Sequence, residues 1–380
     1  MTSPTHYGVI SGILSDPRAI EPALAVLRHH GIDGIIAAGD LSPNSSTEKN
    51  AQDKTAYILD QLGKSGIDTY IIPGSREKLN IFQPVLNHFT DRYQNIISGL
   101  EEQVIEKEGH TLILLPGSPA KMGGHYRLGG PFEGYREEDP PTGFYYTMDN
   151  DVIISKDDPD FQKLRENGEI KGILHYTNPE DLLKWVTDPD NSIIVSNEPR
   201  RFYDRNTCVD ASNYCKVNEY HEVYEVTFTS GKEGSIVATT PISSAIRSGS
   251  TSGLFQKSFG IEKVNRCYAL KKGSMFNATK ADEFARLGID VSCIHDNEGS
   301  DVLRDIYEEI GVSKAISAHF RGGAHRAHTI DETPLKPDSA THELFWNPGD
   351  LDRGLCGILT INDSKASYQN IDLKDYIRKA

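Results

Sequence analysis

Short runs of apolar, often β-branched residues, each ending in Gly, Asp or Ser, alternate along this chain with segments of helical periodicity. Tyr7–Ser11, for example, precedes Pro17–His30, in which Ile20, Leu24 and Leu27 fall on one helical face. Such alternation is typical of parallel βαβ units. Because the runs are apolar on both faces, the sheets they form must be covered on both sides. The sequence therefore predicts a layered α/β fold.

The same pattern predicts the remaining elements. A polar loop is expected over Ser42–Asn50, a helix around Ala56–Lys64, a hairpin from Tyr220–Phe228 and Gly234–Thr239, and a long ordered loop over Gly117–Thr147. Further strands are expected at Gly34–Ala38, Thr69–Ile72, Asn95–Ser98, Thr111–Leu115, Val152–Ser155, Ser192–Ser196, Asp290–Ile294, Lys314–Ala318, Gly357–Ile361 and Ala366–Ile371.

Polar residues stand where several of these strands end. The carboxyl ends of parallel strands are where α/β folds gather their ligands, so these residues are the candidates for chemistry. They occur in the segments Ser11-Gly12-Ile13-Leu14, Gly39-Asp40, Gly74-Ser75-Arg76-Glu77, Asn197-Glu198-Pro199 and His319-Phe320-Arg321.

This series resembles, in order and spacing, the calcineurin-like metallophosphoesterases, which carry D-x-H, G-D, G-N-H-[DE], V-S-H-x-P-P and G-H-x-H segments. The resemblance runs nearly end to end, and the later matches are Ile194–Pro199, Gly299–Arg304, Ala315–His319 and Asn347–Asp350. It implies a four-layer α/β/β/α sandwich with an inserted subdomain. In that family two divalent metals activate a water and hold the phosphoryl oxygens.

The family's ligand positions are largely replaced in this chain. The D-x-H pair falls on Gly12 and Leu14, while Asp40 and His319 keep the family's residue type. The remaining positions carry Ser75, Arg76, Asn197 and Arg321. Divalent ions need four to six good ligands, and arginine stays protonated, so we expect no two-metal centre and no catalytic residue. The alternative is an active phosphoesterase with an atypical site for manganese or another divalent metal, recruiting His295, His325 or His328.

The two arginines permit a different ligand. Arg76 and Arg321 are expected to converge on the former phosphate position with Ser75, Asn197 and the backbone N–H groups of Gly74 and Gly12. Guanidinium groups bind phosphate with two parallel hydrogen bonds, so the pocket could hold a phosphate, nucleotide or phosphopeptide. The competing interpretation is an internal salt bridge between Arg321 and Asp40.

Other histidines and cysteines give weak signals. His325-x-x-His328 has the spacing of a metal pair, but polar loop residues are the favoured interpretation. Cys208 and Cys215 with His221 have the wrong spacing for a zinc ribbon or finger, so we expect single buried thiols. The five cysteines in the chain are an odd and sparse set, which favours reduced thiols in a cytoplasmic protein.

The segment 200–297 is predicted to be an inserted subdomain between residues 1–199 and 298–380 of the phosphoesterase-like domain. Between Pro241 and Lys280 it holds seven basic residues and one acidic residue, with aromatic residues interleaved. The candidate partner-binding residues are Arg247, Lys257, Lys263, Arg266, Lys271 and Lys272. A protein partner, a nucleic acid or ribonucleoprotein, and packing within the molecule all stay open.

Composition limits the remaining classes of function. A net charge of −15 argues against a protein that coats nucleic acid with its whole surface. No apolar run approaches the roughly 18 residues that a membrane-spanning helix needs, so we expect no membrane contact. The sequence thus predicts a catalytically inactive phosphoesterase-fold protein that binds or scaffolds a partner, without a cofactor.

Overall fold

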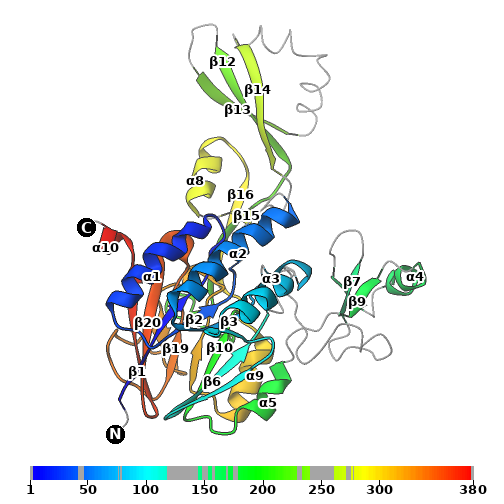
Figure 1. Ribbon diagram of the computed structural model, residues 1–380. Helices are drawn as coiled ribbons and strands as arrows, with labels where there is room; N and C mark the ends of the chain where they lie inside the picture. Colours follow the sequence, from blue (N-terminus) through cyan, green and yellow to red (C-terminus); the bar gives the residue numbers. More distant parts are fainter. Residues whose placement is uncertain are drawn as a thin grey trace. The chain divides into compact units, whose positions relative to one another are not determined.

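The computed structural model describes residues 3–41, 47–75, 77, 79–117, 144–147, 153–155, 159–167, 170–173, 179–228, 233–239, 261–270, 275–276 and 278–377. The chain divides into two compact units (Figure 1). Unit 1 comprises Met1–Ala211 with Asn297–Ala380, and unit 2 comprises Ser212–Asp296. The predicted insertion 200–297 covers unit 2 together with the stretch 200–211 and Asn297, which belong to unit 1.

The first sheet of unit 1 has six strands in the order β21-β20-β1-β2-β3-β4. Its parallel part is β1–β4, and β20 joins it antiparallel to β1. The strands are β1 (Thr5–Ile10), β2 (Gly34–Ala38), β3 (Asp68–Ile72), β4 (Ile96–Ser98), β20 (Leu355–Asn362) and β21 (Lys365–Asp372).

The second sheet also has six strands, in the order β18-β19-β17-β10-β6-β5. β6, β10, β17 and β19 run parallel, and β5 and β18 close the edges in antiparallel pairing. The strands are β5 (Val104–Lys107), β6 (His110–Leu115), β10 (Ser192–Ser196), β17 (Lys314–Ile316), β18 (Ala327–His328) and β19 (Leu344–Trp346).

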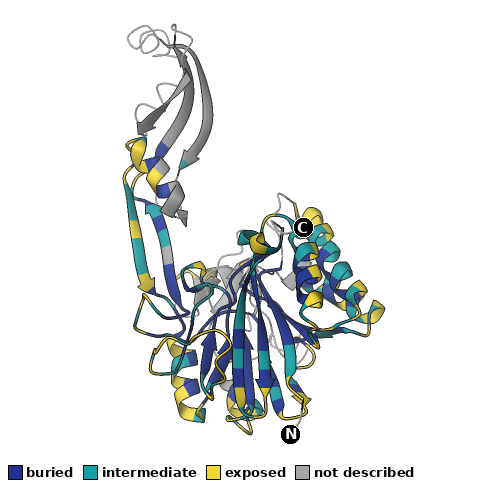
Figure 2. Ribbon diagram, turned by 90° about the vertical axis from the view of Figure 1, so that its left-hand side faces the viewer, coloured by how far each residue is buried: buried dark blue, intermediate teal, exposed yellow. Residues whose placement is uncertain are grey.

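Successive residues of the central strands belong to different buried clusters, as the alternation of side chains along a strand requires. Ile35 and Ala37 of β2 pack with the helices, whereas Ile36 and Ala38 pack with residues of both sheets. Figure 2 shows these strands buried along their length. Because both faces are covered, the strands are apolar throughout, and the predicted α/β class is confirmed.

Helices flank both sheets. α1 (Ile20–His29), α2 (Glu48–Ser65) and α3 (Leu79–Arg92) contribute to the cluster on the first sheet (Figure 1). α5 (Leu182–Trp185) and α9 (Asp301–Ile310) contribute to the cluster on the second. The remaining helices and 3-10 turns of unit 1 are η1 (Pro17–Ala19), α4 (Phe161–Glu166), η3 (Pro179–Asp181), η4 (Arg321–Gly323), η5 (Leu351–Arg353) and α10 (Lys374–Ile377).

Between β6 and β10 in the sequence lies a small antiparallel sheet of β7 (Phe144–Thr147), β8 (Ile153–Ser155) and β9 (Ile170–Ile173). The predicted loop Gly117–Thr147 was wrong at its end, because Phe144–Thr147 forms β7 by pairing with β8 and β9. Residues 118–143 of that prediction lie outside the described residues. The predicted loop Ser42–Asn50 ends earlier than expected, because α2 begins within it. Thr47 caps α2 by accepting a hydrogen bond from the Asn50 N–H at 3.2 Å, so the helix begins at Glu48.

Unit 2 contains two three-stranded sheets, in the orders β15-β11-β16 and β13-β12-β14. The predicted hairpin is confirmed as the antiparallel pair β12–β13. The elements are β11 (Ala211–Val217), β12 (His221–Phe228), β13 (Glu233–Thr239), β14 (Ile261–Leu270), β15 (Met275–Phe276), α8 (Ala278–Arg286) and β16 (Val291–Asn297).

The cysteine prediction was wrong for one pair. Cys215 and Cys293 form a disulfide, whereas Cys208 and Cys356 are free and buried. The partners are 78 residues apart, and only the pairing of β11 with β16 brings them together, which sequence spacing does not reveal. The cytoplasmic location stays a prediction, and the disulfide removes part of the argument for it.

Candidate functional site

Four strand ends bring Asp40, Ser75, Asn197 and His319 into one hydrogen-bonded cluster, as the sequence predicts for the carboxyl edges of β2, β3, β10 and β17. The Ser75 hydroxyl donates to Asp40 Oδ1 at 3.0 Å and lies 3.1 Å from His319 Nδ1. His319 Nδ1 is 3.6 Å from Asp40 Oδ2. Since the serine proton is given to Asp40, its oxygen can accept from the His319 Nδ1–H.

Asp40 is held by its backbone as well as by its side chain. Its φ of 55° is left-handed, which a non-glycine residue adopts rarely and at some cost. The buried Glu77 carboxylate compensates, because its Oε2 accepts from the N–H groups of Asp40 at 3.1 Å and Gly74 at 2.5 Å. Glu77 thus fixes the two loops that present Asp40 and Ser75.

The side-chain amide of Asn197 forms hydrogen bonds to the backbone of two neighbouring strand ends. Oδ1 accepts from the Ser75 N–H at 3.1 Å, and Nδ2 donates to the Ala38 carbonyl at 3.1 Å. The Asn197 carbonyl accepts from the N–H groups of Ala318 and His319. Asn197 therefore ties β2, β3 and β17 to the end of β10. Turning its amide toward a metal would break hydrogen bonds in a buried region, which costs free energy.

The resemblance places a carboxylate at the position of Gly12, where the structure leaves no space for a side chain. Its φ is 62°, and a Cβ atom added to it would lie 2.4 Å from the Cβ of Asp350. Asp350 follows Gly349, whose carbonyl accepts from the Ser11 hydroxyl at 2.6 Å. The loop after β19 therefore packs against the end of β1 where the lost side chain would stand.

Arg321 does not form the predicted salt bridge with Asp40. Its Nη2 lies 3.3 Å from Asp352 Oδ2 and 3.6 Å from Asp350 Oδ1. Asp352 also accepts from the N–H groups of Leu14 and Ser15 and from the Ser15 hydroxyl. Arg353 Nε donates to Asp350 Oδ2 at 2.6 Å. Arg321 is thus bound to carboxylates that the loop geometry fixes, with 46% of its side chain exposed.

Two predicted anion donors are used within the fold. The Gly12 N–H donates to the Gly39 carbonyl at 3.2 Å, and the Gly74 N–H donates to Glu77. The expectation that they face a bound phosphate was therefore wrong. Arg76 lies outside the described residues. Ser75 and Asn197 join the cluster, but their polar groups contact the protein itself.

The donor set does not fit the family's two-metal centre. One carboxylate, one imidazole and a hydroxyl meet in the cluster, and the amide of Asn197 is committed to backbone groups. Over the described residues, no group of three or more His, Cys, Asp and Glu side chains is arranged to hold a metal ion. Hard divalent ions require more oxygen ligands than the cluster supplies.

In the predicted histidine pair of His325 and His328, both ring nitrogens of His328 are used within the fold. His328 is buried on β18 rather than in a polar loop. Its Nε2 accepts from the Val209 N–H at 3.2 Å, and its Nδ1 lies 2.8 Å from the Thr329 carbonyl. Burial lowers the pKa of His328 to about 4 and also lowers the pKa of His325. Both rings are therefore neutral at pH 7, and His328 has no ring nitrogen left for a metal.

The predicted partner-binding residues lie mostly outside the described part of the chain, as Arg247, Lys257, Lys271 and Lys272 do. Lys263 and Arg266 lie on β14, where they pair in register with Thr227 and Tyr224 of β12. His295 lies on β16. His295 therefore belongs to unit 2, whereas Asp40 belongs to unit 1.

Sequence inspection missed the structural part of this site. Glu77, Asp350 and Asp352 organise the loops, and each stands within three residues of a glycine at a strand end or loop. A carboxylate close to a loop glycine in the sequence is the signal that could have indicated these structural residues, because the N–H groups of such loops need hydrogen-bond acceptors.

The comparisons with known proteins leave the family open. No family model and no curated protein matches the sequence. The solved structure of TT1561 from Thermus thermophilus aligns with 97% of this chain and 99% of its own, at 10% identity and a TM-score of 0.45. A second solved structure aligns over 96% of this chain and 98% of its own, at 14% identity and a TM-score of 0.46. Within the described residues, no helix has the length and apolar character needed to cross a bilayer.

Proposed function

We propose that this chain is a non-hydrolytic protein of the calcineurin-like phosphoesterase type, with a four-layer α/β/β/α body, that acts by binding or scaffolding a partner. The observation that carries the proposal is the side chain of Asn197. At the position of a family metal ligand, its amide bonds to Ser75 and Ala38 of the protein itself.

The chemistry of the surrounding residues supports the same conclusion. Asp40 is bonded to Ser75 and His319, and Asp350 stands against Gly12 where the family has a carboxylate. Arg321 adds a fixed positive charge to the loop that should present a histidine. These contacts use charged and polar side chains within the protein, which supports loops that hold together without a cation.

The test is manganese-dependent hydrolysis of bis-p-nitrophenyl phosphate by the purified full chain. We expect no hydrolysis above the rate of an Asp40→Ala variant, because the ligands for a metal-activated water are missing. A manganese-dependent rate that Asp40→Ala abolishes would contradict the proposal and favour the alternative, an active phosphoesterase with an atypical site. Isothermal titration with manganese checks binding independently of turnover.

For the partner we favour an acidic protein surface, since the segment from Pro241 to Lys280 combines seven basic residues with one acidic residue. Binding should be measured at several salt concentrations with the full chain and with a variant lacking 241–280. Loss of binding to an acidic protein in the variant supports the proposal. A log-linear fall with salt for RNA or DNA would favour nucleic acid instead.

A phosphate-containing small molecule is the second candidate, which the half-exposed guanidinium of Arg321 favours. Calorimetric titration with inorganic phosphate should then show weaker binding for Arg76→Ala and Arg321→Ala. Asp350 and Asp352 lie 3.6 and 3.3 Å from the Arg321 guanidinium and compete with phosphate for it. Affinity that is unchanged in both variants would remove this candidate.

A further inference from the structure

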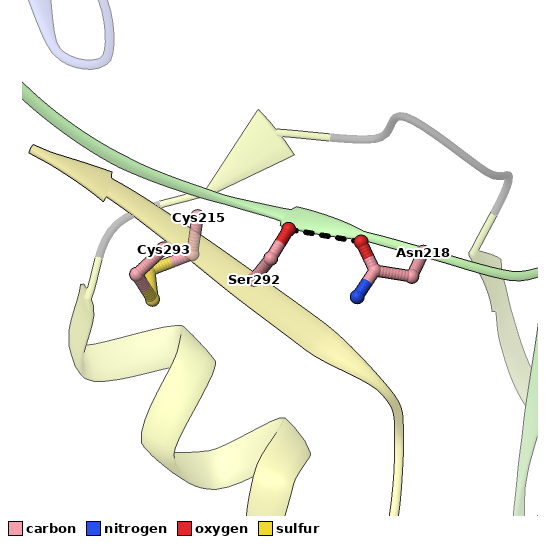
Figure 3. The surroundings of a disulfide bond; sticks show 4 residues. All are labelled: Cys215, Asn218, Ser292 and Cys293. Atoms are coloured by element: carbon pink, nitrogen blue, oxygen red, sulfur yellow. Dashed lines mark hydrogen bonds between the residues drawn. A yellow bond between two sulfur atoms is a disulfide. The ribbon is translucent and has the colours of Figure 1, made fainter.

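The disulfide of unit 2 joins two neighbouring strands. Cys215 on β11 and Cys293 on β16 have Cα atoms 3.9 Å apart. Beside the bond, the Ser292 hydroxyl donates to Asn218 Oδ1 at 2.9 Å (Figure 3). The Asn218 N–H in turn donates to the Asp290 carbonyl at 3.0 Å. The two strands are therefore held by one covalent bond and a short set of hydrogen bonds.

The position of the disulfide in the chain gives it a large effect on the stability of unit 2. The chain passes into unit 2 along β11 and leaves it along β16, so the bond connects the first and last strands of the unit. The cysteines are 78 residues apart, and the enclosed loop contains β12, β13, β14, β15 and α8. Closing a long loop removes conformational entropy from the unfolded chain, which stabilises the folded form.

Among the side chains that the structure describes, one apolar cluster lies in unit 2. Val217, Phe284 and Ile289 form the buried cluster described in unit 2, with Leu270, Leu287 and Val291 partly buried around it. A covalent bond between the first and last strands of the unit adds to the stability that this cluster provides. The pairing of β11 with β16 should therefore weaken when the bond opens.

The two sulfur-bearing residues differ in exposure. Cys215 is buried with 0% exposure, whereas Cys293 is exposed. An external thiolate can therefore approach Sγ of Cys293. Among the cysteines whose side chains the structure describes, Cys208 and Cys356 are free and buried. Burial raises the pKa of each thiol to about 12, so neither supplies a competing thiolate at neutral pH.

We propose that Cys215–Cys293 is a thiol–disulfide exchange site, at which a dithiol reductant opens the pair of strands that leads into and out of unit 2. One thiolate of the reductant attacks Sγ of Cys293 and forms a mixed disulfide. The S–S bond breaks, and its electron pair leaves on Sγ of Cys215, which takes up a proton. The second thiol of the reductant then releases Cys293 as a thiol, and the reductant becomes a disulfide.

The exchange changes the stability of unit 2 and leaves unit 1 unchanged. Unit 1 keeps its three buried clusters, to which the bond does not contribute. The oxidised form presents an ordered unit 2, and the reduced form a loosened one. This inference stands independently of the proposed function, because it concerns the strands around the bond alone.

The test uses the full chain, oxidised or treated with millimolar dithiothreitol under native conditions. Differential alkylation should label Cys215 and Cys293 only after reduction. Limited proteolysis should then cut within 212–296 at least about tenfold faster. A tenfold increase is modest, because opening a loop of this length can remove several kcal/mol of stability. Cleavage within unit 1 should keep its rate.

Two variants separate the bond from its surroundings. Cys293→Ser should show the fast cleavage without reductant. Ser292→Ala keeps the bond and removes only the hydrogen bond to Asn218, so it should respond to dithiothreitol as the unaltered chain does. If Cys293→Ser fails to fold, the titration of the unaltered chain with reductant carries the test.

Three results would overturn the proposal. The first is alkylation of both cysteines before reduction. The second is a bond that dithiothreitol opens only after denaturation. The third is complete reduction with an unchanged rate of cleavage within 212–296.

Discussion

Gly12 illustrates how a single position can exclude the chemistry of a resembling family. Its left-handed φ of 62° suits glycine, and its missing side chain leaves room for the Cβ of Asp350. A carboxylate could return to position 12 only if the loop carrying Asp350 moved. The absence of a side chain at position 12 is therefore coupled to packing between the first strand and the last part of the chain.

Replacing Gly12 by alanine tests this coupling. We expect Gly12→Ala to lower the free energy of unfolding by about 2–4 kcal/mol, from the left-handed backbone plus overpacking against Asp350. Gly31→Ala is the matched control, since Gly31 has a φ of 66° and nothing within 4 Å of the added Cβ. It should cost only about 1 kcal/mol. Equal losses in urea unfolding would contradict the steric argument.

His328 should make stability depend on pH. Burial lowers its pKa in the folded state to about 4 from the ordinary value of 6.5, so the unfolded chain binds the proton first as pH falls. The free energy of unfolding should therefore be retained above pH 6.5 and fall between pH 6.5 and pH 4. From pH 7 to pH 5 the loss due to this residue is about 2 kcal/mol.

The variant His328→Gln isolates that contribution. Glutamine offers an amide oxygen to the Val209 N–H but binds no proton in this range. The pH dependence should flatten by about 2 kcal/mol in urea titrations at pH 7 and pH 5. An unchanged slope would assign the dependence to His110 and His325, whose pKa values burial also lowers.

Residue identity allowed part of the site to be predicted. The gathering of Asp40, Ser75, Asn197 and His319 follows from their places at strand ends, and the structure brings them together. The partner of Arg321 does not follow, because Asp352 stands 31 residues away in a loop whose path depends on packing. The direction of the Asn197 amide likewise depends on which backbone groups the fold leaves unpaired.

At the scale of elements, Asp210 fixes the chain at both ends of the connection to unit 2. It is fully buried, and its carboxylate accepts from the N–H groups of Phe202 at 2.9 Å and Gly299 at 3.3 Å. The Asn297 side chain donates to it at 2.6 Å. Burial raises the pKa of Asp210, which shows that desolvation outweighs these hydrogen bonds.

Removing this acceptor should be costly. Asp210→Ala would leave three donors without their carboxylate, and we expect a loss of about 3–5 kcal/mol in the free energy of unfolding. Asp210→Asn keeps one oxygen and should cost less. Asp204→Asn is a partly exposed control near it in sequence, and it keeps an oxygen for the Asn206 N–H, so it should change little. The order of the three variants in denaturant titrations checks the prediction, and equal costs for Asp210→Ala and Asp204→Asn would refute it.

Strands and turns that depend on neighbouring residues could be predicted from the sequence. Features that depend on residues far apart in the chain could not. The hairpin β12–β13 and the central strands follow from alternation and turn residues. The start of α2 was missed because Thr47 caps the helix within a polar stretch. The disulfide was missed because only the finished sheet places Cys215 beside Cys293.

At the scale of the whole molecule, the two units divide the chain where a deletion should be tolerated. The side chains of Asp210 and Asn297 are bonded at 2.6 Å, so the ends left by removing 212–296 lie close together. Joined by a short Gly/Ser linker, unit 1 should fold and melt within a few degrees of its transition in the full chain. Calorimetry of both proteins checks this, and a deletion variant without a cooperative transition would contradict it.

The pairing of β1 also has a consequence for biosynthesis. Thr5 pairs with Ile361 and Val9 with Gly357, so the first strand borders one of the last. At translation rates of roughly 5–20 residues per second, β1 leaves the ribosome about 20 to 70 seconds before β20 does. One edge of the nascent sheet stays open during that time, and a chaperone that shields exposed strand edges should raise the yield of native chains.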